Sequence, residues 1–268
     1  MTRPIRTALT IAGSDSGGGA GIQADLKTFA ALGVYGTSAI TAITAQNTVG
    51  VTAAQALPAD LVTAQIEAVA SDIHVHATKI GMLATAAIVE AVAAAISALD
   101  LPLVVVDPVM LAKSGDRLLD DDAVTAVIKE LLPRAYLVTP NIPEAEVLSG
   151  MRITTLDDAR TAAVKILESG ASAVVVKGGH ATGDDLVDLL YDGHRFVELH
   201  TPRIHTRNTH GTGCTFASAT SARLALGDSL VDAVTRAQAY VAGAIRHGLA
   251  IGHGHGPLDH FWQTSAQS

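Results

Sequence analysis

The sequence is poor in cysteine, aromatic residues and positive charge, and each shortage excludes a class of protein. A single cysteine, Cys214, rules out an internal disulfide framework and fits a reducing compartment. The 18 basic residues against 26 acidic ones leave a formal net charge of −8, which argues against a nucleic-acid partner because the phosphate backbone needs a basic face. Aromatic residues make up only 3% of the chain, which argues against an aromatic binding surface. We therefore expect a small-molecule ligand.

Long apolar runs are also missing. The apolar run after Arg6 is too short for a signal peptide, and no run reaches the roughly 18 residues that would span a membrane. Apolar residues, 49% of the chain, are spread evenly without a linker, which favours a single α/β domain over residues 1–268. We expect this domain to be cytoplasmic.

The two commonest nucleotide-binding signatures are absent from the first glycine-rich segment. Residues 7–12 read as a strand, 13–21 as a glycine loop and 22–32 as a helix that ends at Gly33. This order opens an α/β fold with a ligand at the carboxyl end of the strand. The loop is not a Walker A motif, since no Gly-Lys-Ser/Thr follows, and it does not match Gly-x-Gly-x-x-Gly. A tight turn explains its glycines equally well.

The rest of the chain alternates apolar strands with helices. Expected strands lie at 37–44, 78–82, 103–106, 136–138 and 173–176, and expected helices at 58–71, 85–99, 121–132, 155–169, 217–226 and 230–247. Continuous apolar runs are typical of parallel strands buried on both faces. Segments 186–191 and 195–199 flank Asp192-Gly193, a hairpin signal, so we expect an antiparallel edge on a mostly parallel sheet.

Polar residues of ligand type follow several of these strands. Asp107 follows 103–106, Asn141 and Glu144 follow 136–138, and Lys177 follows 173–176. Carboxylate and amide oxygens suit Mg²⁺, and a lysine suits a phosphate. Alternatively, Asn141 caps a short helix that has Glu144 in its first turn. Because parallel strands end at one edge of the sheet, we expect a phosphate-and-magnesium site and take phosphoryl transfer as the first hypothesis.

The loop 207–216 leads directly into an expected helix, with residues 211–214 as its turn and first residues. A helix N-terminus exposes unpaired backbone N–H groups that bind phosphate, and Gly211 and Gly213 would let the backbone approach such an anion closely. The helix dipole is expected to lower the pKa of the Cys214 thiol. A tight turn followed by a small buried cysteine is the alternative.

Three further polar features have weaker signals. Gln46, after strand 37–44, carries an amide donor and acceptor suited to the edge of a heterocycle, although such residues are usually satisfied by water. The polar loop 110–116 is a candidate for closing over a ligand. His253 and His255 suggest a metal site, but their flexible glycine spacing and the lack of Cys or carboxylate partners disfavour it.

Eight motifs carry a family resemblance: Ala12-Gly-Ser-Asp-Ser-Gly-Gly-Gly-Ala-Gly-Ile-Gln-Ala-Asp25, Ala45-Gln-Asn-Thr48, Lys79-Ile-Gly-Met82, Asp107-Pro-Val-Met110, Ala112-Lys-Ser-Gly-Asp116, Thr139-Pro-Asn-Ile-Pro-Glu144, Val176-Lys-Gly-Gly-His180 and Asn208-Thr-His-Gly-Thr-Gly-Cys214. In this order, over nearly the whole chain, they resemble the bacterial hydroxymethylpyrimidine/phosphomethylpyrimidine kinases of thiamin synthesis, within the ribokinase-like superfamily. The resemblance implies a three-layer α/β/α sandwich, ATP and Mg²⁺ as cofactors, and a homodimer. It also implies phosphorylation of 4-amino-5-hydroxymethyl-2-methylpyrimidine to its monophosphate and then to the diphosphate.

The same resemblance implies roles for single residues. The pyrimidine would be recognised by Gln46, in a pocket lined by Asp25, Gly13, Met82 and Val109. Mg²⁺ and the phosphates would be organised by Asp107, Asn141 and Glu144, and the ATP phosphates would lie near Lys177 and Thr209. The anion hole would be formed by Gly211, Thr212 and Gly213. The proton of the substrate hydroxyl would be accepted by Cys214, which takes the place of the aspartate in the sugar-kinase motif Gly-Ala-Gly-Asp.

Three alternatives stay open. A pyridoxal or pyridoxine kinase of the same branch is the nearest, although strong pyridoxal kinases can carry a second lid cysteine where this chain has Met110. A degenerate ligand-binding protein on the same fold is less in keeping with the presence of Asp107, Glu144, Lys177 and Cys214. A cysteine-nucleophile hydrolase would need a histidine oriented on the thiol, and His210 is close in sequence.

Overall fold

The computed structural model describes residues 5–110, 121–182 and 185–265. In this part of the chain one nine-stranded sheet has the order β3-β2-β1-β4-β5-β6-β7-β8-β9. Its strands are β1 (Thr7–Asp15), β2 (Tyr35–Gln46), β3 (Val51–Ala56), β4 (Ala77–Ile80), β5 (Val104–Val106), β6 (Leu137–Val138), β7 (Val174–Thr182), β8 (Asp185–Tyr191) and β9 (Phe196–Pro202). In this order the strands from β2 to β7 pair in parallel, and β8 and β9 form the predicted antiparallel hairpin.

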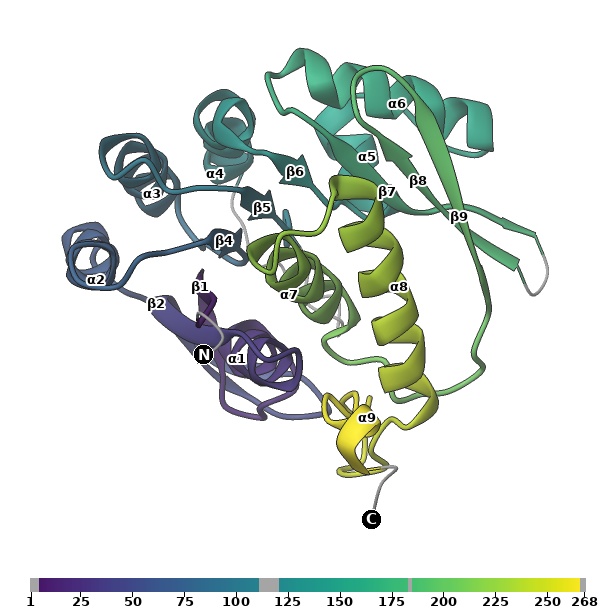
Figure 1. The fold of residues 1–268 in the computed structure, drawn as a ribbon, viewed down its shortest axis with the longest axis horizontal. Coiled ribbons are helices and arrows are strands. Elements are labelled where there is room, and N and C mark those ends of the chain that lie inside the picture. The colour runs from purple at the N-terminus through teal and green to yellow at the C-terminus, as the bar shows by residue number, and fades with distance from the viewer. Residues whose placement is uncertain (1–4, 111–120, 183–184, 266–268) are drawn as a thin grey trace.

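Helices cover both faces of this sheet (Figure 1). One face carries α1 (Gly21–Ala31), α7 (Thr212–Ala225) and α8 (Leu230–Arg246). The other carries α2 (Ala59–Ala70), α3 (Ala86–Ala98), α4 (Asp121–Ala126), α5 (Ile142–Ser149) and α6 (Leu156–Glu168). This is the predicted three-layer α/β/α sandwich with a mostly parallel central sheet. A short α9 (Trp262–Ser265) follows near the C-terminus.

Successive side chains along the apolar strands point into two different hydrophobic cores, one on each face of the sheet. In β5, Val104 and Val106 belong to the core under α2, α3 and α6, whereas Val105 belongs to the core under α7 and α8. All three are almost completely buried. Period-two alternation in a strand therefore puts apolar side chains into both layers, which is why β5 reads as a continuous apolar run.

Two elements differ from the expectation. β3 pairs antiparallel with β2, but its Val-Thr-Ala-Ala-Gln-Ala sequence is largely exposed and lacks the apolar alternation that would have revealed a strand. The helix predicted at 121–132 is regular only as α4, and continues as a π-helical turn, Val127–Leu131, and a 3₁₀ turn, Leu132–Arg134. Pro133 lacks the N–H donor that a regular helix would need there.

No helix in the described ranges combines the length and the apolar character needed to cross a bilayer.

Candidate active site

A cavity of about 910 Å³ opens at the edge of the sheet where the parallel strands end. It is lined by residues from the ends of β1, β2, β4 and β5, from the start of α5, from β7 and from the N-terminus of α7. The predicted site residues found in its wall are Gly13, Gln46, Met82, Asp107, Val109, Asn141, Glu144, Lys177, Thr209, Gly211, Thr212, Gly213 and Cys214. Strand ends far apart in the sequence therefore converge, as the parallel topology predicts.

Asp25 is the exception among the predicted pocket residues. It lies on α1, is fully buried, and is not among the residues that line the cavity. Its carboxylate accepts hydrogen bonds from Lys79 Nζ at 2.9 Å, Thr10 Oγ1 at 2.6 Å and Ser218 Oγ at 2.5 Å. Asp25 therefore joins α1, α7 and two strands behind the pocket wall, and its partner Lys79, also fully buried, belongs to that wall. A lysine within the expected strand 78–82 was the signal that sequence reasoning missed, because lysine is rarely buried without a partner.

The N-terminus of α7 has the geometry of an anion site. Gly211 is its N-cap residue, with a left-handed backbone of φ 83°, and no side chain caps the first N–H groups. A β-carbon on Gly211 would lie 1.8 Å from the carbonyl oxygen of Gly19, so the two glycine loops touch through their backbones. The N–H group of Thr212 donates to the Thr209 carbonyl at 3.4 Å, and the N–H groups of Gly213 and Cys214, which no capping side chain covers, are the ones available to a phosphate.

Opposite this helix end, Lys177 and Asp107 form an ion pair. Lys177 Nζ lies 2.9 Å from Asp107 Oδ1, and a β-carbon on Gly213 would lie 3.3 Å from the same Nζ. Burial acts against the charge of Lys177, but the carboxylates of Asp107 and Glu144 outweigh it and raise the pKa of the ammonium. Lys177 is thus a permanent cation directly beside the helix N-terminus.

Asn141 and Glu144 combine the two roles considered for them. The Glu144 N–H donates to Asn141 Oδ1 at 3.0 Å and the Asn141 N–H donates to Glu144 Oε2 at 2.8 Å, a capping box that starts α5. Both residues also line the cavity. The interpretation of Asn141 as a helix cap is therefore correct, and the capping box holds the Glu144 carboxylate in the cavity wall.

The carboxylates of Glu144 and Asp107 fit a divalent cation. Burial raises the pKa of Glu144 to about 7; Lys177 lowers it, and the nearby Asp107 carboxylate raises it further. A Mg²⁺ ion would favour the ionised form of Glu144, and Mg²⁺ commonly binds one or two carboxylates and keeps several waters. Among the described residues there is no cluster of three or more His, Cys, Asp or Glu side chains, so an ion here would depend on water or phosphate for its remaining ligands.

This raised pKa predicts a pH-dependent stability in Mg²⁺-free buffer. The pKa of Glu144 is about 7 in the folded protein against an ordinary 4.5, so the folded state retains a proton that the unfolded chain releases. The free energy of unfolding therefore falls as pH rises from about 4.5 to about 7. Glu144→Gln keeps a side-chain oxygen for the capping box and removes the titration. We expect the variant to gain up to roughly 3 kcal/mol over the wild type between pH 5 and pH 8, measured by urea denaturation.

The exposed Glu67 on α2 provides the control, since Glu67→Gln removes a carboxylate that is not buried. Its stability difference from the wild type should be nearly the same at both pH values. A pH-independent difference for Glu144→Gln as well would show that Glu144 does not titrate in this range.

Cys214 differs from its prediction. It is half-buried in the first turn of α7, and burial raises the pKa of its thiol to about 11. The Lys79 ammonium lowers this pKa, but the carboxylates of Asp25 and Asp107 raise it again. The predicted lowering by the helix terminus is therefore wrong, because burial and two nearby carboxylates outweigh the Lys79 ammonium.

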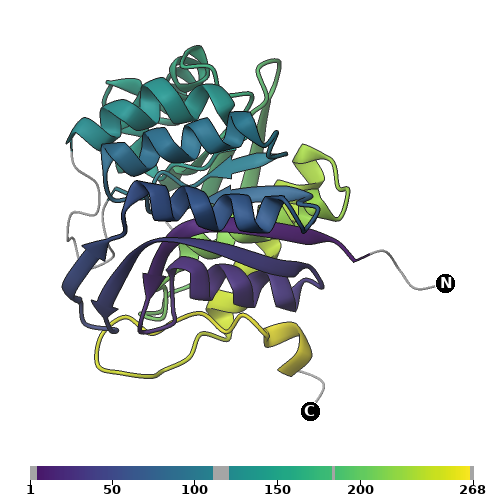
Figure 2. The same ribbon diagram turned by 90° about the vertical axis from the view of Figure 1, so that its left-hand side faces the viewer.

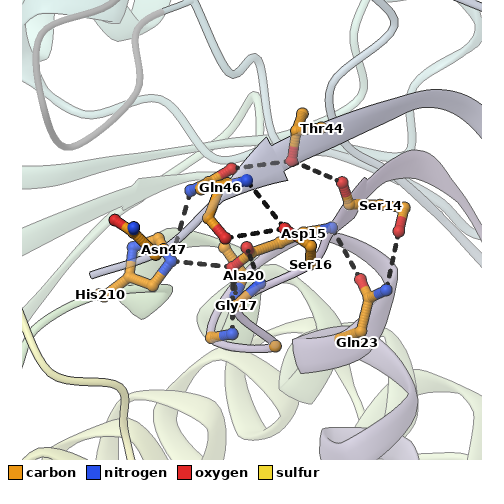
Figure 3. Close-up of polar contacts among 12 residues, drawn as sticks. Ser14, Asp15, Ser16, Gly17, Ala20, Gln23, Thr44, Gln46, Asn47 and His210 are labelled. Atoms are coloured by element: carbon orange, nitrogen blue, oxygen red, sulfur yellow. Dashed lines mark hydrogen bonds and ion pairs between the residues drawn. The ribbon is translucent and has the colours of Figure 1, made fainter. Parts of the chain in front are cut away.

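Two residues at the other end of the cavity were not predicted to act together. Asp15, at the end of β1, accepts hydrogen bonds from the N–H groups of Gly17, Gly19 and Ala20 and pairs with His210 Nε2 at 2.9 Å (Figure 3). Burial alone would raise the pKa of Asp15, but these hydrogen bonds, with that of His210 the largest, lower it. An aspartate at the start of a glycine loop was the available signal, since Asp side chains accept from nearby backbone N–H groups.

The C-terminal segment 248–258 lies against this end of the site. Its His255 N–H donates to the Thr48 carbonyl at 2.9 Å, and Gly256 O accepts from the His210 N–H at 3.1 Å. Figure 2 shows the segment, in yellow, passing below α1 towards the turn between β2 and β3. His255 and Gly256 therefore make backbone hydrogen bonds that link the loops of Thr48 and His210. The interpretation of His253 and His255 as a metal site gains no support within the described residues.

The loop 110–116, considered as a cover for the ligand, lies outside the described residues apart from Met110, which is buried in the cavity wall.

A parallel sheet edge that joins a helix N-terminus, a lysine and two carboxylates in one cavity defines a phosphotransferase of the α/β class. Residues 15–259 match the model of the phosphomethylpyrimidine kinase family, and the chain belongs to this family.

Individual relatives agree with this assignment. The chain is 51% identical over 258 residues to the hydroxymethylpyrimidine/phosphomethylpyrimidine kinase of Bacillus subtilis, covering 96% of this chain and 95% of the relative. It is 54% identical over 258 residues to the protein of the same name from Rhizobium meliloti, covering 95% and 96%. Among solved structures, the Bacillus subtilis pyridoxal kinase in its ADP complex superposes with a TM-score of 0.90 at 40% identity, covering 97% of this chain and 99% of that chain.

Proposed function

We propose that this protein is an ATP- and Mg²⁺-dependent kinase that phosphorylates 4-amino-5-hydroxymethyl-2-methylpyrimidine to the monophosphate and then to the diphosphate in thiamin biosynthesis. The observation that carries the proposal is the single cavity that joins the uncapped N-terminus of α7, the Lys177–Asp107 pair and Gln46. The naming of its relatives as hydroxymethylpyrimidine/phosphomethylpyrimidine kinases supports the substrate. The ADP complex of a structural relative supports ATP as the phosphoryl donor.

The residues of the cavity have separate roles in phosphoryl transfer. The N–H groups of Gly213 and Cys214 bind the phosphoryl group in transit, and Lys177 neutralises its charge without needing to move. Asn141 and Thr209 contact the ATP phosphates. Asp107 and Glu144 would hold Mg²⁺, which supplies charge neutralisation on the phosphates when bound. Gly13, Gln46, Met82 and Val109 hold the pyrimidine, and Cys214 faces its hydroxyl.

We predict that Cys214 accepts the hydroxyl proton as its thiolate. Because the thiol pKa is about 11, the thiolate fraction grows tenfold per pH unit between pH 7 and pH 9, and kcat should rise in parallel where chemistry limits the rate. Cys214→Ala should lower kcat by about 10²-fold, a value typical of a lost general base, with little change in KM. Cys214→Asp should remain active with a flat profile over this range. Unchanged turnover in Cys214→Ala would refute the base assignment.

The function itself is tested by following ADP release and phosphorylated products from hydroxymethylpyrimidine and from pyridoxal, with and without Mg²⁺. We expect the pyrimidine to give the monophosphate first and the diphosphate second. Pyridoxal phosphorylation is the second candidate activity, favoured by the TM-score of 0.90 to a pyridoxal kinase. If only pyridoxal reacts, the substrate assignment to Gln46 fails; if neither reacts, kinase activity itself is excluded.

Three further proposals accompany this function. The single continuous sheet supports one domain over residues 1–268. The single cysteine supports a cytoplasmic location. A homodimer is the assembly implied by the family resemblance, and its test is the mass of the purified protein in solution.

A further inference from the structure

Strand β7 is irregular at the point where it carries Lys177. Val176 and His180 lie four residues apart on β7, but their pairing partners on β8 are only two residues apart. Residues 177–179 of β7 therefore lie opposite the single β8 residue Asp188. A bulge of this kind takes backbone groups out of the ladder and redirects a side chain, and bulges are common beside active sites.

The Asp188 carboxylate replaces a backbone partner in this bulge. Its Oδ1 accepts a hydrogen bond from the Gly178 N–H at 2.7 Å. Gly178 has a left-handed backbone, φ 64°, and a β-carbon on it would meet no heavy atom within 4 Å. The backbone conformation, and not a lack of space, therefore favours glycine here. The N–H group that the bulge removes from the ladder is satisfied by a side chain instead.

The second carboxylate oxygen anchors Asp188 to helix α8. Asp188 Oδ2 accepts from Gln238 Nε2 at 2.9 Å, and the same nitrogen donates to the Leu199 carbonyl on β9 at 3.0 Å. Burial raises the pKa of the Asp188 carboxyl, whereas its two hydrogen bonds and the charge of Lys177 lower it. Each oxygen thus has a donor, and the carboxylate is held between the bulge and α8.

Lys177, which precedes Gly178, is fixed at its backbone and at its ammonium group. Its N–H donates to the Pro140 carbonyl at 2.8 Å, and its Nζ pairs with Asp107 Oδ1 at 2.9 Å. A β-carbon on Gly213, in the first turn of α7, would lie 3.3 Å from this Nζ. Because a peptide group is planar, the direction of the Gly178 N–H also fixes the peptide plane that follows Lys177.

We propose that Asp188 is a positioning residue for phosphoryl transfer: by binding the Gly178 N–H, it fixes the bulge that keeps the Lys177 ammonium beside the N-terminus of α7. This inference rests on the proposed function, in which Lys177 neutralises the phosphoryl group in transit. Asp188 is not among the residues that line the cavity, so it acts through Lys177. A cation that is already in place stabilises the transition state without reorganisation, and a displaced one does not.

The test compares kcat with KM in Asp188 variants. Asp188→Ala removes the acceptor, and we expect kcat to fall at least about tenfold, the value of one hydrogen bond, with the aminopyrimidine KM within about twofold of the wild type. Asp188→Asn keeps an oxygen for the Gly178 N–H and should restore most of the wild-type kcat. In a Lys177→Ala background, Asp188→Ala should lower kcat no further.

Two control variants distinguish positioning from general stability. Gln238→Met removes the hydrogen bond between Asp188 and α8 but leaves the acceptor of the Gly178 N–H. It should lower the free energy of unfolding, measured by urea denaturation, and leave kcat near the wild-type value. Asp185→Ala removes a carboxylate from the same strand that is 52% exposed and pairs with His200. It should leave kcat unchanged.

Wild-type kcat in Asp188→Ala, equal losses in Asp188→Asn and Asp188→Ala, or an undiminished effect in the Lys177→Ala background would each overturn the proposal. If Asp188→Ala does not fold, amide hydrogen exchange of Gly178 in the wild type replaces it. A protected Gly178 N–H supports the proposal, and one that exchanges as fast as in an unfolded chain overturns it.

A wild-type enzyme that leaves the aminopyrimidine unphosphorylated would refute the proposed function instead. In that case the ligand-free crystal structure of Asp188→Ala decides the inference without any activity. A Lys177 Nζ displaced from its contact with Asp107 Oδ1 supports the positioning role, and an unchanged ion pair overturns it.

Discussion

Gly211→Ala is expected to lower kcat by at least about 10²- to 10³-fold, the loss seen when a preorganised oxyanion donor is removed. The added β-carbon would lie 1.8 Å from the Gly19 carbonyl oxygen, and the backbone φ of 83° is itself unfavourable for alanine. Backbone atoms cannot move aside as a flexible side chain can, so residues 211–214 must shift. The first N–H groups of α7 would then no longer point at the phosphoryl group. Steady-state kinetics at saturating ATP measure the effect.

Gly227, just beyond the other end of α7, distinguishes the effect of the left-handed backbone from the effect of the close contact with the Gly19 carbonyl. It has a similar left-handed backbone, φ 94°, but a β-carbon added to it would meet no heavy atom within 4 Å. Gly227→Ala should therefore cost about 1–2 kcal/mol of stability through the backbone alone and leave kcat unchanged. If Gly211→Ala kept wild-type turnover, the α7 N-terminus would not be the phosphoryl-binding site.

Lys79→Met should be the most destabilising single substitution among those considered, by about 3–5 kcal/mol. Lys79 and Asp25 form an ion pair at 2.9 Å with both side chains 0% exposed. Methionine fills a similar volume but leaves the Asp25 carboxylate buried without a counter-charge. Burial acts against the charge of Lys79, and Asp25 outweighs it to raise the pKa of the ammonium, so Lys79 stays charged at neutral pH. Urea denaturation with the exposed-lysine control Lys165→Met gives the size of the effect.

A double variant distinguishes loss of the charge pair from loss of packing. Lys79→Met combined with Asp25→Asn removes both charges, and the amide oxygen can still accept from either Thr10 or Ser218, which donate to different oxygens of the Asp25 carboxylate. We expect it to be clearly more stable than Lys79→Met alone. Equal destabilisation of the single and double variants would mean that the ion pair adds nothing beyond the shape of its side chains.

Sequence reasoning succeeded where one local pattern controls the outcome. The apolar runs at 103–106 and 173–176 predicted parallel strands because both of their faces are covered by helices. Asp192-Gly193 predicted the β8–β9 hairpin because few other dipeptides favour that turn. The convergence of Asp107, Glu144, Lys177 and Gly211 followed from parallel topology, since all four lie at the edge of the sheet where the parallel strands end.

Sequence reasoning failed where a residue's pKa or partner depends on groups that are distant in the sequence. The thiol of Cys214 has a raised pKa because burial and two carboxylates outweigh the helix terminus, and none of these can be weighed without distances. Asp25 was placed in the pocket, whereas it pairs with a lysine 54 residues away behind the wall. The partnership of Asp15 with His210 spans 195 residues, and no local spacing could have indicated it.

The contacts of segment 248–258 also set an order of events during synthesis. His210 and Thr48 are translated well before Gly256 and His255, whose backbones bind them. A nascent chain can pair β1 with β2 and even form α7 while the ends of its two site loops still lack these partners. The Thr48 and His210 loops would then gain these hydrogen bonds only after segment 248–258 has been synthesised.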